Sequence, residues 1–190
     1  MVHKYDFLVI GSGLAGMSFA LKVAHKGKVA LICKAGLEEA NTYYAQGGIA
    51  SVTDLTVDNF DKHIEDTMIA GDHISDPAAV EKVVKGAPAQ IEELIRWGVN
   101  FDKKENGDFD LHKEGGHSEF RILHHKDNTG AEIQTSLIEA VKAHPNITVL
   151  TNHFAVGWNW MNSISFTTPF ARYTIAMPSP VATSGLVVWR

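Results

Sequence analysis

The glycine-rich stretch GSGLAG, from Gly11 to Gly16, constrains the fold of this chain more than any other segment. It follows the apolar run YDFLVI without a gap, and it opens a segment whose apolar residues recur at helical spacing. The apolar run KVALIC, which ends at Cys33, has the composition of a second buried strand. A strand, a helix and a strand within about thirty residues predict a βαβ unit, and hence an α/β fold with a parallel sheet.

The three glycines of this stretch have the spacing of a dinucleotide-binding loop. Gly11 permits the tight turn after the strand, Gly13 lets the backbone approach a pyrophosphate, and Gly16 lets the helix pack closely on the strand. The phosphates then bind the free N–H groups at the positive end of the helix dipole. The alternative is a purely structural turn, which is common between a strand and a helix. The full context of strand, glycines and helix favours dinucleotide binding.

The residue that follows the second strand departs from the pattern of NAD-binding proteins. Those proteins place an acidic residue there, about twenty residues after the glycines, where it binds the ribose hydroxyls. This chain has Lys34 at that position, and Glu38 and Glu39 follow slightly late, in a loop. The lysine argues against NAD, and it either serves the adenosine side of another dinucleotide or is simply exposed.

The segment NTYYAQGG, from Asn41 to Gly48, comes where the chain is expected to cross the mouth of the sheet. Asn41 and Thr42 offer side-chain hydrogen bonds, and Gly47 and Gly48 offer bare backbone N–H groups. Such a loop can wrap a flat ring with polar edges, as a flavin has. Taken alone, the segment would instead be interpreted as a glycine turn with two packed tyrosines.

Helical patterns recur further along the chain. Apolar residues at every fourth position predict an amphipathic helix over 58–70. Two further helices are predicted to start at prolines, one at Pro77 and one at Pro88, and Gly98 is predicted to end the second. After another helical segment, the run ITVL over 147–150 predicts a return to strand.

Composition excludes several classes of function. The chain has 190 residues, a net charge of −5 and 45% hydrophobic residues, which is typical of a globular protein and offers no basic surface for nucleic acid. Its apolar runs are far shorter than the roughly 20 residues of a membrane helix, and the N-terminus lacks a signal peptide. The lone Cys33 cannot form an internal disulfide, which favours a reducing compartment. We therefore expect a cytoplasmic protein.

The stretch EGGHSEFRILHHKD, from Glu114 to Asp127, concentrates histidines and acids. A metal site is one interpretation, but the histidines over 112–125 are spaced H-x4-H-x6-H-H, which is no standard zinc pattern, and no cysteine accompanies them. We therefore predict no metal. Because histidines are often satisfied by packing and hydrogen bonds, we expect His124 and His125 to be structural.

Together these motifs resemble those of the fumarate reductase and succinate dehydrogenase flavoprotein superfamily, and within it the L-aspartate oxidase family. The resemblance extends from Tyr5 to about Val156, and it rests on VIGSGLAG, Lys34, NTYYAQGG, HIEDTMIAG and EGGHSEFRILHHKDNTG. It implies a Rossmann-like FAD-binding domain with a parallel sheet, in residues 1–156. The domain is expected to be incomplete, because the capping and C-terminal helical domains of the family are absent from these residues.

The same resemblance implies a reaction. Members of the family oxidise L-aspartate to iminoaspartate with FAD, and oxygen or fumarate accepts the electrons. The product leads to quinolinate and NAD, which implies a functional link to quinolinate synthase. Because the family's cationic substrate residues lie in segments that are absent here, we expect these 190 residues alone to be inactive.

One position distinguishes the branches of the superfamily. The membrane-complex members attach FAD covalently through a histidine just before their Thr-x-x-Ala-Gln-Gly-Gly run, where this chain has Asn41. The resemblance therefore implies FAD that is bound non-covalently. A fumarate reductase or succinate dehydrogenase flavoprotein is the first alternative, and a non-catalytic fragment that binds FAD or another nucleotide is the second.

Carried over residue by residue, the resemblance assigns roles at two sites. Glu114 matches the family's catalytic glutamate, whose carboxylate can engage the α-ammonium group of the substrate. His117 and Arg121 match positions of the substrate pocket, although they could instead brace the loop. The expected FAD contacts are Gly11, Ser12, Gly13, Leu14, Ala15, Gly16, Lys34, Asn41, Thr42, Tyr43, Tyr44, Ala45, Gln46, Gly47 and Gly48.

The composition changes after Thr151. No Asp, Glu or Lys follows, and three of the four tryptophans lie in this last part of the chain. We therefore expect residues 157–190 to be an aberrant tail of unknown structure, which a frameshift in the gene would explain. The alternative is that the tail belongs to a genuine, unrelated short protein.

Overall fold

The structure is a computed structural model that describes residues 2–159, 163–167 and 172–176. The chain forms two compact units. The first, called unit 1 below, comprises Met1–Tyr43 and Gln134–Arg190, and the second, unit 2, comprises 44–133. Each unit is described by itself.

Unit 1 contains the predicted parallel sheet. Its strands are β2 (Phe7–Ile10), β3 (Val29–Ile32) and β6 (Ile147–Leu150), in the order β2-β3-β6. The central strand β3 pairs in parallel with both neighbours and is buried along its whole length, as its continuous apolar sequence predicts. The α/β fold with a parallel sheet, predicted from the sequence, is confirmed.

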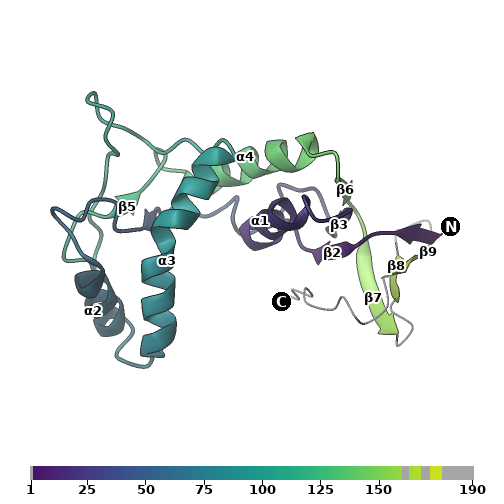
Figure 1. Cartoon of the computed structure of the whole chain (residues 1–190), viewed down its shortest axis with the longest axis horizontal. Coiled ribbons are helices and arrows are strands. Elements are labelled where there is room, and N and C mark those ends of the chain that lie inside the picture. Colours follow the sequence, from purple (N-terminus) through teal and green to yellow (C-terminus); the bar gives the residue numbers. More distant parts are fainter. Residues whose placement is uncertain (1, 160–162, 168–171, 177–190) are drawn as a thin grey trace. The chain divides into compact units, whose positions relative to one another are not determined.

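Helix α1 (Leu14–Val23) connects β2 to β3 and packs against both strands (Figure 1). Its buried residues Met17 and Ala20 are completely inaccessible to solvent. The helix ends before Gly27. Gly27 must lack a side chain, because a Cβ there would lie 2.5 Å from the Asp6 carboxylate.

A second sheet lies in unit 1, with the strand order β1-β9-β8-β7. Its strands are β1 (Val2–Lys4), β7 (Phe154–Asn159), β8 (Ser163–Thr167) and β9 (Arg172–Ala176). The domain boundary predicted after Val156 therefore falls inside β7. Residues 160–162, 168–171 and 177–190 of the predicted tail lie outside the described residues. The frameshift hypothesis stays a prediction.

Unit 2 is built around two helices, α2 (Phe60–Ala70) and α3 (Pro77–Arg96), which pack against each other (Figure 1). The short strands β4 (Ile49–Ala50) and β5 (Ile122–Leu123) pair antiparallel. The last helix, α4 (Thr129–Ala143), begins in unit 2 and buries Leu137 and Val141 in unit 1. None of the helices in the described part of the chain is long and apolar enough to span a bilayer.

The two helices predicted to start at Pro77 and Pro88 are one continuous helix, so the prediction of a break at Pro88 is wrong. A proline inside a helix removes one backbone hydrogen bond, but it does not end the helix where packing holds both halves in line. The buried residues Val80, Val84, Ile91 and Leu94 supply that packing, on both sides of the proline.

The predicted end of α3 at Gly98 is confirmed. Gly98 has a φ of 100°, the Val99 N–H donates to the Leu94 carbonyl, and the Gly98 N–H donates to the Ile95 carbonyl. This is a Schellman motif, in which glycine takes the left-handed conformation at no steric cost.

Candidate functional site

The loop between β2 and α1 has the geometry that its glycines predict. Gly11 takes a φ of 110°, and its N–H donates to the Ile32 carbonyl of the neighbouring strand. A Cβ on Gly16 would lie 2.1 Å from the Gly11 carbonyl oxygen, so only glycine allows α1 to approach the turn this closely. Gly13 precedes the helix and offers no side-chain cap. The first turn of α1 is therefore open to an external anion.

Two side chains shape this loop from other parts of unit 1. The Thr42 hydroxyl accepts a hydrogen bond from the Leu14 N–H at 3.1 Å. The Gln134 amide donates to the Ser12 carbonyl at 2.8 Å and to the Leu37 carbonyl at 2.6 Å. Sequence reasoning missed Gln134, because nothing in its neighbourhood distinguishes it from other polar residues of a helix.

A cleft of about 660 Å³ lies at the end of the parallel sheet. Its lining includes Gly11 to Ala15 from the loop, Lys34 from the end of β3, and Asn41 and Thr42. This volume is typical of a site for a cofactor-sized ligand. The open helix N-terminus and the exposed Lys34 ammonium group both suit a ligand that carries a pyrophosphate. The residues present therefore fit the nucleotide part of FAD.

Cys33 contributes to the same cleft, but as a packed side chain. Burial raises the pKa of its thiol, although a hydrogen bond with Ser12 lowers it in part. A thiol with a raised pKa is mostly protonated at neutral pH and is a weak nucleophile. Cys33 is therefore a structural residue of the cleft.

The segment from Tyr44 to Gly48, predicted to contact the flavin, belongs to unit 2. Gly48 is required by packing, since a Cβ would lie 2.3 Å from the Leu123 carbonyl oxygen, whereas a Cβ on Gly47 would meet nothing within 4 Å. Tyr43 and Tyr44 are 37% and 62% exposed, so they are not the packed tyrosines of the alternative interpretation. The segment remains accessible to a ligand.

Glu114 lies at the start of a tight turn in unit 2. The His117 N–H donates to the Glu114 carbonyl, and Gly116 takes a φ of 84°. The Glu114 side chain is exposed. Next to it, the residues Gly115, Gly116 and His117 line a cavity of about 670 Å³, whose other walls come mainly from α2 and α3 and include Ala50 of β4. The turn thus presents an exposed carboxylate beside a cavity.

Arg121 lies behind this turn and is fully buried. Its Nε and Nη2 donate to the two carboxylate oxygens of Asp58, both at 2.8 Å, and its Nη1 donates to Asp66. The Ser118 N–H and hydroxyl also donate to Asp66, so this carboxylate joins α2 to the turn. The guanidinium of Arg121 already binds two carboxylates of the protein. The arrangement therefore supports the alternative in which Arg121 braces the loop.

The charges of this network shift the pKa values of its members. Burial alone would raise the pKa of Asp66, but hydrogen bonds from Ser118 and Arg121 outweigh it and hold the pKa at about 2. The pKa of Asp58 is lowered as well, because Arg121 outweighs its burial. Burial, assisted by the nearby Arg121, lowers the pKa of His63. His63 is therefore neutral at pH 7 and adds no charge beside Arg121.

The histidines of the stretch from Glu114 to Asp127 differ in their surroundings. His117, matched to the substrate pocket, lines the cavity with its ring 5.7 Å from that of His63. His125 is hydrogen-bonded through Nδ1 to the Asn100 carbonyl at 2.7 Å, which agrees with the structural role predicted for it. His124 is buried, but neither of its ring nitrogens has a hydrogen-bond partner among the described residues. The structural role expected of His124 stays a prediction.

The sequence matches a known family. The pattern of the family described as "FAD binding domain" covers residues 6–159. The chain is 49% identical over 152 residues to the chloroplastic L-aspartate oxidase of Arabidopsis thaliana, which covers 80% of this chain and 23% of that protein. It is 48% identical over 159 residues to the L-aspartate oxidase of Vibrio cholerae, which covers 81% of this chain and 30% of that protein. The chain thus spans less than a third of the length of these relatives.

Solved structures agree on the fold. The E. coli quinol fumarate reductase subunit FrdA, solved as a mutant, superposes on 93% of this chain and 32% of its own with a TM-score of 0.84, at 24% identity. Mycobacterium smegmatis Sdh1 in complex with UQ1 superposes on 93% of this chain and 33% of its own with a TM-score of 0.81, at 25% identity.

Proposed function

Because this chain belongs to the FAD binding domain family, we propose that it is the N-terminal part of an L-aspartate oxidase and binds FAD non-covalently. The observation that carries the proposal is the N-terminus of α1, where Gly16 packs against Gly11 and the cleft is lined by Gly13, Leu14 and Ala15 together with Lys34. The identity of 42–49% to several L-aspartate oxidases supports the choice of substrate.

The loop between β2 and α1 would hold the pyrophosphate of FAD. The N–H groups of Ala15 and Gly16 lie in the first helical turn, where an anion is stabilised by the helix dipole. Thr42 fixes the start of the helix through Leu14, and Lys34 adds a positive charge at the end of β3. When bound, FAD supplies the ring that accepts the two electrons of the oxidation.

The turn that carries Glu114 would position the substrate. L-Aspartate has an α-ammonium group, and an exposed carboxylate such as that of Glu114 can bind it by charge-assisted hydrogen bonds. The Arg121 network keeps this turn in place, because Asp66 holds Ser118 while Arg121 holds Asp66. Arg121 is thus a positioning residue, and His117 stays a candidate for the substrate pocket.

Several finer assignments belong to the same proposal. Oxygen or fumarate would accept the electrons, and iminoaspartate would enter the synthesis of quinolinate and NAD, which links the protein to quinolinate synthase. The free, buried Cys33 thiol supports a reducing compartment such as the cytoplasm.

A fumarate reductase or succinate dehydrogenase flavoprotein is a second candidate, which the TM-score of 0.84 to a fumarate reductase subunit favours. Against it stands Asn41, at the position where the covalently flavinylated members carry histidine. A nucleotide-binding fragment without catalysis is the third candidate, since the chain covers only 23–30% of its two relatives described above.

A chimera separates these candidates. Residues 1–156 of this chain would replace the matching segment of the Vibrio cholerae L-aspartate oxidase, and flavin bleaching would be followed without oxygen after addition of L-aspartate or succinate. We expect L-aspartate alone to bleach the flavin, and all flavin to be released on acid precipitation. Bleaching by succinate alone, or flavin that stays in the pellet, would contradict the proposal in favour of the second candidate. A folded chimera that binds FAD without bleaching would favour the third.

Two variants of the chimera test the role of Glu114. Glu114→Gln removes the charge and should raise the KM for L-aspartate at least about tenfold, since a hydrogen bond to a charged group contributes about 1.5–3 kcal/mol. Glu105→Gln makes the same change at another exposed position of unit 2 and should leave KM unchanged. Equal KM values for the two variants would exclude a contact between Glu114 and the substrate.

A further inference from the structure

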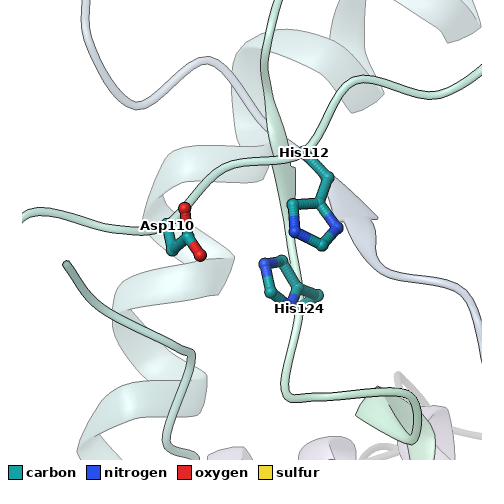
Figure 2. A group of neighbouring side chains, drawn as sticks. All are labelled: Asp110, His112 and His124. Carbon is teal, nitrogen blue, oxygen red and sulfur yellow. The ribbon is translucent and has the colours of Figure 1, made fainter.

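Three side chains of unit 2 form a group that the flavin site does not use. Asp110, His112 and His124 each bring one potential ligand atom to within 4.8 Å of the others. Figure 2 shows the two imidazole rings facing each other, with the Asp110 carboxylate directed toward the same space. Two ring nitrogens and one carboxylate oxygen are a donor set that suits zinc and similar divalent ions.

Strand pairing brings these residues together. His112 forms an antiparallel bridge with Ile122, in which each residue donates its N–H to the carbonyl of the other, both at 3.0 Å. Asp110 lies two residues before this bridge on one segment, and His124 lies two residues after it on the other. Because side chains alternate along extended chain, residues two apart share a face. The linear spacing, from which we predicted no metal, does not reveal this juxtaposition.

His124 is the member of the group that requires a partner. It is only 7% exposed, and both of its ring nitrogens are buried without a hydrogen bond in the described part of the chain. A buried polar group that makes no hydrogen bond loses its hydration without compensation. Its ring stacks on that of His112 with 3.6 Å between the centroids, and stacking satisfies neither nitrogen. Nδ1 has the Asp102 carboxylate 3.4 Å away, so it is the buried Nε2, without a hydrogen-bond partner among the described residues, that points to a ligand bound here.

Asp102 is placed to orient the buried ring. Its Oδ2 lies 3.4 Å from Nδ1 of His124, while its main chain is tied to the same residue by the hydrogen bond from the Asp102 N–H to the His124 carbonyl. In metal sites a carboxylate behind the ligating histidine fixes the ring and raises its basicity. This arrangement leaves Nε2 of His124 as the ligand atom.

We propose that Asp110, His112 and His124 bind a divalent transition-metal ion of the zinc class, with Asp102 as the carboxylate that orients His124. His124 is the fixed ligand, and the exposed His112 turns out of the ring stack to direct its own nitrogen at the ion. Three protein ligands leave one position of a tetrahedral ion to water. The ion would join the segment of Asp110 and His112 to β5, and this role is independent of flavin binding.

Metal titration of the purified 190-residue chain tests the proposal. Calorimetry should show one Zn²⁺ per chain, Co²⁺ should give the visible absorption of a tetrahedral site, and Mg²⁺ should not compete, because it prefers oxygen ligands. The test variants are His112→Ala and Asp110→Asn, which change side chains that are not fully buried and so spare the core. Each should weaken Zn²⁺ binding at least about tenfold, because even the loss of an outer-shell partner costs 10–100-fold.

His25→Ala is the matched control, since it removes an exposed histidine from unit 1. Zn²⁺ binding that this control retains, and that both test variants lose while their circular dichroism is unchanged, supports the site. Equal affinity in wild type and His112→Ala would overturn the proposal. So would a titration of the folded chain without a saturable step at one ion, because it would show only scattered surface binding.

Discussion

Arg121 and Asp58 form a two-point ion pair in the interior of unit 2, although they lie 63 positions apart in the sequence. Their side chains are 1% and 3% exposed, and both Nε and Nη2 donate to the carboxylate at 2.8 Å. Asp66 accepts from the third nitrogen, so one guanidinium holds together the segment before α2, the helix itself and the turn after Glu114. The turn that presents Glu114 therefore depends on a buried charge.

Asp58→Asn should destabilise the chain strongly. The change keeps the shape of the side chain but leaves part of the Arg121 charge uncompensated in the interior, and breaking a buried pair in this way typically costs about 3–5 kcal/mol. The free energy of unfolding, measured in urea by circular dichroism, checks this. Asp61→Asn makes the same change at an exposed position of α2 and should have little effect. If the two variants were equally stable, the buried pair would not determine stability.

The stability of the chain should also depend on pH through Asp66. Its pKa is about 2 in the folded chain, below its ordinary value of 3.8, because hydrogen bonds from Ser118 and Arg121 favour the ionised carboxylate. A lowered pKa means that the contribution of Asp66 is complete above pH 3.8 and is lost as the pH falls toward 2. The urea midpoint of the wild type should fall across this window, and that of Asp66→Asn should fall less steeply. Parallel curves would contradict the assignment.

The sequence predicted the parts of the fold that depend on neighbouring residues. The strand before Gly11, the close approach at Gly16 and the end of α3 at Gly98 each follow from a local requirement of the backbone, and the structure has all three. The backbone geometry around the helix N-terminus could be predicted for the same reason, whereas the FAD contacts assigned to its residues stay a prediction. When a motif spans only a few residues, the backbone geometry that it requires can be predicted from those residues alone.

Other features depend on residues that are distant in the sequence. The break at Pro88 was wrongly predicted because the packing that holds α3 straight comes from buried residues on both sides of the proline. Gln134 reaches Ser12 across 122 positions, and His112 meets His124 through strand pairing. No local sequence pattern predicts such contacts. The hydrogen bond that Gln134 donates to the loop and the stacking of His112 on His124 are therefore visible only in the folded chain.

Gly16→Ala should abolish FAD binding and reduce stability. A Cβ there would lie 2.1 Å from the Gly11 carbonyl oxygen, so α1 must move away from the turn, and overpacking of this kind costs about 1–3 kcal/mol. Fluorescence quenching of FAD by the purified chain measures the first effect and urea unfolding the second. Gly86→Ala is the control, because its Cβ would meet nothing within 4 Å. Inside a helix this control should gain about 0.4–1 kcal/mol and leave FAD binding unchanged. Normal FAD affinity in Gly16→Ala would exclude the loop as the pyrophosphate site.

Gln134→Leu should weaken FAD binding without any change in the residues that line the cleft. The Gln134 amide holds the carbonyls of Ser12 and Leu37, at 2.8 and 2.6 Å, and thereby fixes the loop whose N–H groups would bind the pyrophosphate. Leucine has a similar volume but no donor, so the Ser12 carbonyl loses a buried hydrogen bond, at about 1–3 kcal/mol. Glu139→Leu, an exposed change on the same helix, is the control. We expect a higher Kd for FAD in Gln134→Leu alone, measured where circular dichroism shows both variants folded. An unchanged Kd would mean that the loop keeps its conformation without this hydrogen bond.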